Sequence, residues 1–560
     1  MSGPARHAER ELADWRRIRR YAVPRWMIEQ ATERRLAGDW AGACAAARVR
    51  VPFDLPSVAN EHGAETAAAL EEELRHLAPD LLRWHLPRYR HGRATIATRQ
   101  ALILAEYGEV TLHVRTPTMA DGPQHLTLCF EPVAPESHED EYLEDRTEEI
   151  DWTGVRHLWD VRRSAELLER CGGTDRAPFF HADGRPLAAA ELGGSGDAAG
   201  LAERVTLLQD RGDLEAAFAA AGFEVDLTPP NVSSYYDRDP RPVLTRMPIA
   251  LSRLLPEIRR RGGTRHRAAA AWPFSVQIET GQQSRVQVVA QKPMAGAPYD
   301  PETLPEAVWR RLPDLDLLRT GAIGPDDLHP LVRSALFPAL PESATRPPES
   351  WRPEPVRVRC RGEWHEVAVH DGDLKIPHSD EELEREQALR ALGGEIAGCF
   401  TTYAAWHGAE GRLPRRLRDQ RQELFLRAQH GDAPGVLRLL DAGADPRARD
   451  GRKRTLLHVL HWLDHEELLP RLLKAGLDLE IADQNGRTPL HMAVGDHGSP
   501  ELIRALVDAG ARIDVVDEME FGLIDFIKRW KRTDLGWLRE RLEAECPDAG
   551  GAFWSAEEGY

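Results

Sequence analysis

Histidine and acidic side chains gather near the end of the chain, where their types could suggest a metal site. His458, His461, Asp464 and His465 lie within eight consecutive residues. Zinc needs ligands that converge on one point, and these four straddle an expected helix end. We therefore expect structural roles for these side chains and no bound metal.

Other short patterns that could do chemistry fail on their context. Gly194 and Gly196 follow an alanine-rich helix, whereas a dinucleotide-binding fingerprint follows a strand. His365 and His370 are five residues apart on an alternating strand, so they face opposite sides, while a zinc-protease helix needs a spacing of four. The six cysteines, at 44, 129, 171, 360, 399 and 546, form no C-x-x-C pair. The sequence therefore provides no catalytic residue and predicts no cofactor.

Composition limits the class of protein. The chain has 560 residues, 42% of them hydrophobic and 29% charged, and a net charge of −18. These values predict several soluble domains, and the negative charge argues against a nucleic-acid partner. No run approaches the ~20 apolar residues of a membrane span, and the N-terminus lacks the apolar core of a signal peptide. We expect a cytoplasmic protein. Because only Lys292, Lys375, Lys453, Lys474, Lys528 and Lys531 are lysines, with arginine dominating the basic residues, we also expect a bacterial, GC-rich source.

The last quarter of the chain repeats itself with a step of about 33 residues. The tetrapeptide Thr455-Leu456-Leu457-His458 recurs as Thr488-Pro489-Leu490-His491. Before the second copy, Asp483–Gly486 forms a tight turn. Thr488 then caps a short helix with Pro489 in its first position, and Gly510 ends a second helix. The remaining residues that keep the step are Gly443 and Gly476, and Asp450 and Asp517.

This pattern resembles the ankyrin-repeat family over about residues 420–545. The resemblance implies an all-α solenoid in which neighbouring units bury one another's apolar faces. The first and last units lack the tetrapeptide and resemble caps, so we expect two full repeats between two atypical ones. In the first full repeat, Leu456 replaces the usual proline, and Pro470 falls inside the second helix, where it removes a backbone donor.

The resemblance also implies an unidentified protein partner, bound by the hairpin tips and the concave face of the first helices. Trp462 is a candidate contact because exposed tryptophan is favoured at binding hot spots; alternatively, it packs against the neighbouring unit. The whole repeat region either recruits a partner or packs on the preceding domain. The candidate contacts at the tips are Arg452, Lys453, Arg454, Gln484 and Asn485.

The first 420 residues contain a weaker internal similarity. Residues 34–47 and 207–222 each read as helix, Gly-Asp turn and helix. Each is followed by an amphipathic helix, two strand-like runs and a segment with tryptophan, Trp159 or Trp309. We propose a duplicated α+β unit over about 25–175 and 200–345. The alternative is that Gly-Asp is a common helix connection in alanine-rich sequence.

Together these patterns predict a multidomain α+β protein, with a mixed α/β N-terminal region of duplicated helix-hairpin plus strand-pair units and a C-terminal all-α ankyrin-repeat solenoid. Acidic residues 136–151 are expected to form a solvated loop, and Pro-rich residues 338–355 a linker. A β-hairpin around Gly362 precedes a helix opened by a Ser379–Glu382 capping box. The expected domains are 1–190, 200–345, 355–419 (β-hairpin plus helical connector), 420–545 (ankyrin repeats) and 546–560 (disordered tail).

Two functions from different classes follow. The first is a non-enzymatic scaffold or interaction protein whose ankyrin repeats recruit a protein partner. The alternative is an enzyme of unknown reaction in the N-terminal α+β region, with the repeats as a docking appendage. The enzyme hypothesis requires a deep polar pocket with converging titratable groups. The acidic charge also suggests a third class, a toxin–antitoxin or immunity-type binder.

Overall fold

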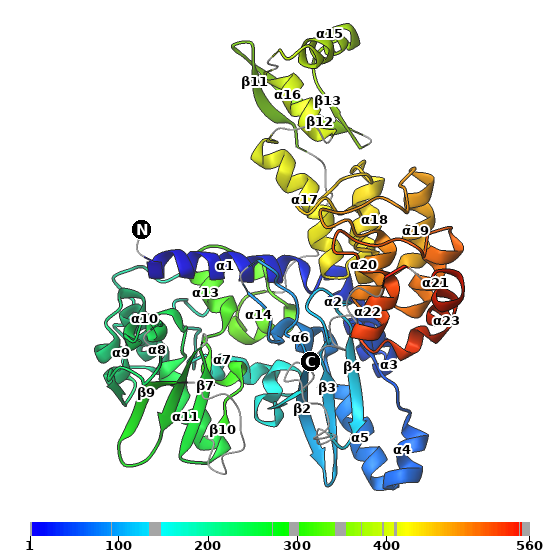
Figure 1. Cartoon of the computed structure of the whole chain (residues 1–560). Coiled ribbons are helices and arrows are strands. Elements are labelled where there is room, and N and C mark those ends of the chain that lie inside the picture. Colours follow the sequence, from blue (N-terminus) through cyan, green and yellow to red (C-terminus); the bar gives the residue numbers. More distant parts are fainter. Residues whose placement is uncertain are drawn as a thin grey trace. The chain divides into compact units, whose positions relative to one another are not determined.

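A computed structural model describes residues 3–90, 92–133, 147–233, 235–270, 273–290, 302–341, 354–370, 372–394, 397–407, 412–547 and 549–550. It divides into two compact units (Figure 1), residues 1–120 with 125–344, and residues 121–124 with 345–560. Both predicted N-terminal domains fall in the first unit. Most of the predicted linker at 338–355 and of the predicted disordered tail at 546–560 lies outside the described residues.

The first half of the first unit builds a five-stranded sheet with the order β1-β4-β3-β2-β5. The inner strands are antiparallel, β1 runs parallel to β4, and β5 runs parallel to β2. Gly108, with φ +72°, makes the tight turn between β2 and β3. The elements are α1 (Gly3–Tyr21), α2 (Arg25–Leu36), α3 (Trp40–Ala46), β1 (Val49–Arg50), α4 (Leu55–His62), α5 (Ala64–His76), α6 (Pro79–His85), β2 (Gln100–Tyr107), β3 (Val110–Arg115), β4 (Leu126–Glu131), β5 (Glu148–Asp151) and α7 (Leu167–Arg170).

The second half builds another five-stranded sheet, with the order β10-β7-β8-β9-β6. Its inner strands are also antiparallel, β6 runs parallel to β9, and β10 runs parallel to β7. The two sheets therefore share strand order and strand directions. The elements are α8 (Ala198–Arg211), α9 (Leu214–Ala220), β6 (Phe223–Asp226), α10 (Pro240–Arg246), α11 (Leu251–Arg261), β7 (Arg265–Ala269), β8 (Phe274–Glu279), β9 (Ser284–Ala290), β10 (Glu302–Thr303), α12 (Glu306–Trp309), α13 (Pro313–Arg319) and α14 (Pro330–Leu336).

The prediction of a loop over 136–151 was wrong for its last four residues. Residues 134–146 lie outside the described residues, but Glu148–Asp151 forms strand β5 and pairs with β2. As an edge strand its side chains are only half-buried or exposed, which lets a strand carry acidic residues. Charge alone therefore does not exclude this segment from the sheet.

Both halves of the first unit share one apolar core, which runs from Trp15 in α1 to Phe337 after α14. A buried ion pair crosses this core. The Arg19 guanidinium donates from Nε and Nη2 to the two carboxylate oxygens of Asp314 in α13, at 2.8 and 2.7 Å. The two side chains are 2% and 0% exposed, and Trp84 Nε1 also donates to Asp314. This network fixes α1 against the second half of the unit.

The second unit begins with a three-stranded antiparallel sheet, in the order β11-β12-β13. The predicted hairpin around Gly362 is confirmed, since Arg361 and Gly362 both have positive φ in the turn. The predicted capping box at Ser379 and Glu382 is also present. The elements are β11 (Val356–Cys360), β12 (Glu363–His370), β13 (Asp373–Lys375), α15 (Asp380–Ala391) and α16 (Cys399–Trp406).

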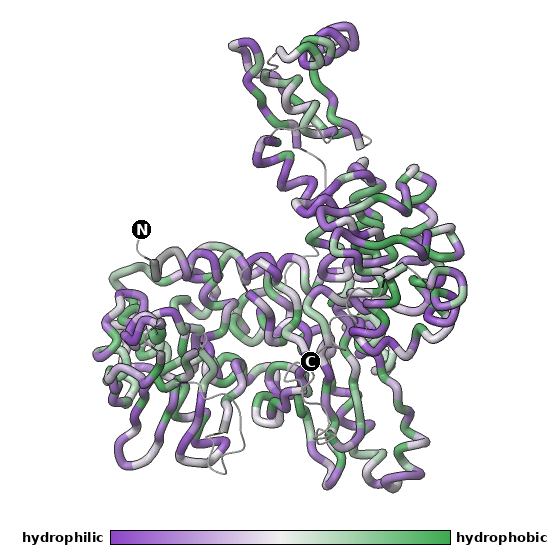
Figure 2. Tube along the Cα trace, in the orientation of Figure 1, coloured by the Kyte–Doolittle hydropathy of each residue, from purple (hydrophilic) through white to green (hydrophobic). Residues whose placement is uncertain are grey.

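Four helix pairs follow and share a second core of the unit. The predicted boundary at 419/420 lies inside α17. Leu417 of this helix packs with the β11–α16 segment, whereas Leu424 and Phe425 pack with the helix pairs. Figure 2 shows α15 and the start of α17 as largely hydrophilic. The pairs are α17 (Arg415–Gln429) with α18 (Ala433–Asp441), η5 (Leu460–Trp462) with α19 (His465–Lys474), α20 (Pro489–Gly495) with α21 (Pro500–Asp508), and α22 (Leu523–Arg529) with α23 (Gly536–Glu545).

The first full repeat differs from the next repeat at its first helix. Where the next repeat has α20, capped by Thr488 with Pro489 at its start, residues 456–459 form turns that lead into the three-residue 3-10 helix η5. Leu456 lacks the pre-set backbone angle that proline gives a first helical position. Pro470 lies inside α19, as predicted. Across the described residues, every helix is too short or too polar to cross a bilayer.

Candidate partner-binding site

Aspartates at the repeat step organise the hairpin tips between the helix pairs. Asp450 Oδ1 accepts hydrogen bonds from the backbone N–H groups of Arg452 and Arg454, at 2.8 and 2.9 Å. Asp483 does the same for Asn485 and Arg487, at 2.8 and 3.0 Å. A short side chain that satisfies two backbone donors closes the turn and holds it in one conformation.

Backbone hydrogen bonds join successive tips. The N–H of Gln484 donates to the carbonyl of Arg452 at 3.0 Å, and the N–H of Glu518 donates to the carbonyl of Asn485 at 3.0 Å. Gly486, with φ +75°, lies so close to the next tip that an added Cβ would stand 2.9 Å from the backbone N of Glu518. The tips therefore present their side chains at fixed spacing.

The structure brings most of the predicted contact residues together on these tips. Arg452 and Lys453 are exposed on one tip, and Gln484 and Asn485 are exposed on the next. Arg454 differs, because its side chain is 11% exposed, pairs with Asp450 at 2.7 Å and lies over the ring of Trp462. The Arg454 side chain therefore stabilises the tip and offers little positive charge to a partner.

Trp462 lies inside the second unit rather than on its surface. It is 4% exposed and belongs to the core shared by the helix pairs. Of the two alternatives given by the sequence, a surface anchor or a packed ring, the structure favours packing.

One histidine in each tetrapeptide contacts the chain that leads to the following tip, and this gives His458 the structural role expected of it. His458 Nδ1 accepts from the N–H of Thr455 at 3.1 Å, and its Nε2 lies 3.1 Å from the carbonyl oxygen of Arg487. His491 repeats this geometry with Thr488 and Val515, at 3.2 and 3.2 Å. Because both nitrogens of each ring have partners, neither ring offers a free lone pair to a metal.

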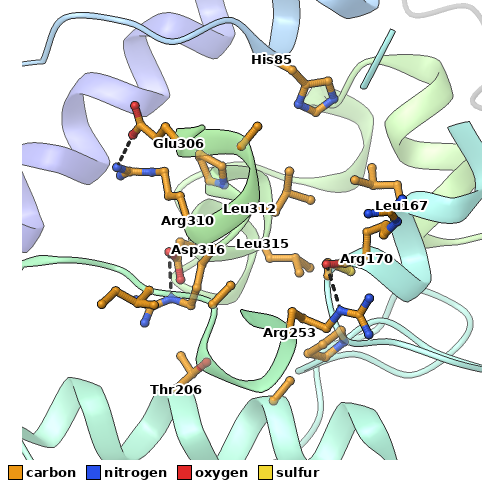
Figure 3. Close-up of a pocket in the computed structure, with 18 of the residues that line it drawn as sticks. His85, Leu167, Arg170, Thr206, Arg253, Glu306, Arg310, Leu312, Leu315 and Asp316 are labelled. Atoms are coloured by element: carbon orange, nitrogen blue, oxygen red, sulfur yellow. Dashed lines mark hydrogen bonds and ion pairs between the residues drawn. The ribbon is translucent and has the colours of Figure 1, made fainter. Parts of the chain in front are cut away.

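The first unit contains a separate cavity of about 100 Å³. Figure 3 shows Glu306 and Arg310 on one side, Arg170 and Arg253 on another, and Leu312 and Leu315 between them. The charged groups are paired. The Arg310 guanidinium lies 2.7 Å from the Glu306 carboxylate, and Arg170 pairs with Glu257.

The pKa values of Glu306 and of two histidines in this cavity are all lowered, but for different physical reasons. Burial opposes ionisation of Glu306, but the guanidiniums of Arg310 and Arg90 outweigh it and hold the pKa of this carboxyl below its usual range. Burial, followed by the positive charges of nearby arginines, lowers the pKa of His85 and His157 well below the ordinary histidine value. Among the described protein groups, His85 Nε2 and His157 Nδ1 have no hydrogen-bond partner. The cavity thus holds two neutral imidazoles beside closed ion pairs.

Comparison with known proteins confirms the ankyrin prediction for one region. A family model for ankyrin repeats, in three copies, matches residues 424–517. The E3 ubiquitin-protein ligase KEG of Arabidopsis thaliana is 32% identical over 115 residues, 20% of this chain and 7% of the relative. The ankyrin repeat-containing protein P1E11.10 of Schizosaccharomyces pombe is 37% identical over 67 residues, 12% of this chain and 32% of the relative. The human transient receptor potential cation channel subfamily A member 1 is 35% identical over 68 residues, 12% of this chain and 6% of the relative. The chain thus spans at most about a third of the length of each of these relatives.

The sequence indicated the tip residues but not what holds them. Asp450, Asp483 and Asp517 were visible as a repeated spacing, and their side chains prove to be the acceptors that close each turn. The signal that could have identified this role is an aspartate two residues before an exposed position, repeated at Arg452, Asn485 and Met519.

Proposed function

We propose that this chain is a scaffold protein whose ankyrin repeats recruit a protein partner through the two adjacent tips at Arg452–Lys453 and Gln484–Asn485. The observation that carries the proposal is the exposure of these four side chains on turns that backbone hydrogen bonds lock to one another. Pre-ordered contact residues lower the entropic cost of binding. The positive charges of Arg452 and Lys453 favour an acidic surface on the partner.

The test compares matched full-length variants in affinity capture. The tip variant carries Arg452→Glu and Lys453→Glu. The control carries Arg415→Glu and Arg416→Glu, which make the same change in net charge at side chains that are 86% and 72% exposed. We expect the tip variant to lose a specific partner that the wild type and the control both retain.

Purified components then measure the interaction directly. Binding by the tip variant should weaken at least tenfold, and the wild-type affinity should fall with added salt, since exposed charges are screened. Equal affinity of the wild type and the tip variant for the captured partner would overturn the assignment of these tips.

The proposal includes an internal duplication, in which the two halves of the first unit are copies of one α+β unit. Support comes from the shared strand order of its two sheets and from one matched contact. The N–H of Ala78 donates to the carbonyl of Trp159 at 2.8 Å, and the N–H of Ala250 donates to the carbonyl of Trp309 at 2.8 Å. Ala78 directly precedes α6 and Ala250 directly precedes α11, and each tryptophan follows the last strand of its half.

A second candidate function is small-molecule binding or catalysis in the cavity of the first unit. His85 and His157 favour it, because both line the cavity and each has a ring nitrogen without a hydrogen-bond partner among the described protein groups. A ligand screen by thermal shift tests it with the wild type and His85→Phe. A compound that stabilises only the wild type would support a site; identical responses across the screen would remove the candidate.

A further inference from the structure

Two cysteines and two histidines meet in the β11–α16 segment of the second unit, away from the tips. Cys360 ends β11, His365 lies on β12, His378 follows β13, and Cys399 begins α16. One ligand atom from each lies within 4.8 Å of every other. We propose that these four side chains bind a structural zinc ion.

The distances between the ligand atoms match a tetrahedron around zinc. With Zn–S of about 2.3 Å and Zn–N of about 2.0–2.1 Å, tetrahedral geometry places sulfur about 3.6 Å from nitrogen, and two nitrogens about 3.3 Å apart. Cys360 Sγ lies 3.6 Å from His378 Nε2, and Cys399 Sγ lies 3.6 Å from His365 Nδ1. The two ring nitrogens are 3.2 Å apart. Cysteine and histidine ligands together also favour zinc over magnesium or calcium, which prefer oxygen.

The backbone is shaped to bring these ligands together. Gly398 precedes Cys399 with φ +64°, and a Cβ there would stand 2.6 Å from Cys360 Cα and 2.8 Å from the carbonyl oxygen of Arg359. Only glycine permits this approach of α16 to the end of β11. The two cysteines are 1% and 0% exposed, so the site is closed on that side.

A second layer of contacts orients one histidine. His378 Nδ1 lies 3.3 Å from a carboxylate oxygen of Glu382, which directs Nε2 toward the other three ligands. Metal-binding histidines commonly bond a carboxylate through their other nitrogen. Phe400 packs against the His378 ring, with centroids 4.4 Å apart.

The small size of the surrounding core explains why a metal would be needed. Among the described residues, ten buried apolar side chains form it, and two of these are the cysteine ligands. Cores of this size rarely stabilise a fold without a disulfide or a metal. A zinc ion would join β11, β12, the segment after β13 and α16 at one point, and would contribute its binding energy to folding.

A second group, His113, Cys129 and Glu131 in the first unit, is a weaker candidate. Glu131 is half exposed and pairs with Arg115 at 2.6 Å, and His113 Nδ1 lies 3.0 Å from the Thr111 hydroxyl. Because two of its three members have other partners, we do not propose a metal there.

Metal analysis and cobalt substitution of the reduced full-length chain test the proposal. We expect one zinc per chain by mass spectrometry, and the intense visible bands of tetrahedral cobalt with thiolate ligands after exchange. Removal of zinc by a chelator should speed hydrogen exchange in peptides from residues 356–406 and leave the first unit unchanged.

Matched variants assign the ligands. His365→Gln and Cys399→Ser should each lower retained zinc at least tenfold, while His370→Gln on the same strand and Cys546→Ser should retain it. The cobalt spectrum of the wild type provides a test even if Cys399→Ser fails to fold. Weak octahedral cobalt bands, full zinc content in His365→Gln, or a Cys360–Cys399 disulfide in freshly purified protein would overturn the proposal.

Discussion

Mild acid should destabilise the second unit through His458 and His491. Both rings are at most 1% exposed. The hydrogen-bond pattern assigns a neutral ring in which Nδ1 accepts a backbone N–H, so an added proton would oppose that donor. Burial lowers the pKa of each histidine from an ordinary value of 6.5 to about 4.

The size of the effect follows from this difference in pKa. Because the folded pKa is the lower one, the unfolded chain binds more protons between pH 6.5 and 4, and stability falls as the pH falls. The stabilisation is complete above about pH 6.5 and is lost as the pH drops through about 4. For each histidine, acidification from about pH 7.5 to about pH 5 should lower the free energy of unfolding by about 2 kcal/mol.

Urea unfolding at about pH 7.5 and pH 5, followed by hydrogen exchange, measures this loss of unfolding free energy in peptides of the second unit. His491→Gln keeps a donor and an acceptor but does not titrate in this range. Its loss of stability on acidification should be about 2 kcal/mol smaller than that of the wild type. His370→Gln, at an exposed strand position, serves as the control. Equal loss of stability in His491→Gln and the wild type would show that protonation of His491 does not cause the loss.

Three further predictions concern packing and turns. Asp314→Ala should destabilise the first unit by about 3–5 kcal/mol in urea unfolding, because it leaves the Arg19 guanidinium buried without its carboxylate. Lys453→Gly should stabilise the second unit by about 0.5–1 kcal/mol, because Lys453 has φ +62° where the next tip has Gly486. Thr488→Ala should cost about 1 kcal/mol, because it removes the side-chain cap of α20.

Each of these predictions has a contradicting result. Replacing both partners, Arg19→Met with Asp314→Leu, should cost less than Asp314→Ala; a larger cost would show that the pair itself stabilises the fold. A loss of stability in Lys453→Gly would mean that the lysine side chain outweighs its backbone strain. Thr488→Ser should behave like the wild type, and a cost equal to that of the alanine variant would assign the effect to the threonine methyl group.

The sequence predicted elements whose signals are local. Thr488 and Pro489 define a helix start within two residues, and Arg361 with Gly362 defines a hairpin. Short strands such as β1 and β10, two residues each, have no periodicity to detect. They exist because they pair in parallel with strands far along the chain, which local pattern cannot reveal.

The four proposed zinc ligands were missed for a related reason. Paired zinc ligands in short motifs stand two to five residues apart. Here Cys360 and His365 are close in sequence, but His378 and Cys399 come from later elements, and Gly398 brings the last of them into place. His365 does not pair with His370; it meets His378 and Cys399, which come from other elements. Trp462 shows the same limit, because its burial depends on packing between neighbouring repeats.

The length of helix α17 determines which way its leucines face in two cores of the second unit. It contains neither glycine nor proline from Arg415 to Gln429, and it contributes Leu417 to one core and Leu424 to the other. Seven helical residues advance about 10.5 Å and return to nearly the same face.

This spacing makes the helix sensitive to changes in length. One inserted residue between Leu417 and Leu424 would turn everything after it by about 100° and carry one leucine out of its core. An insertion of seven residues would restore the facing and lengthen the helix by about 10.5 Å. In this part of the chain, length variation is therefore expected only in steps of whole heptads.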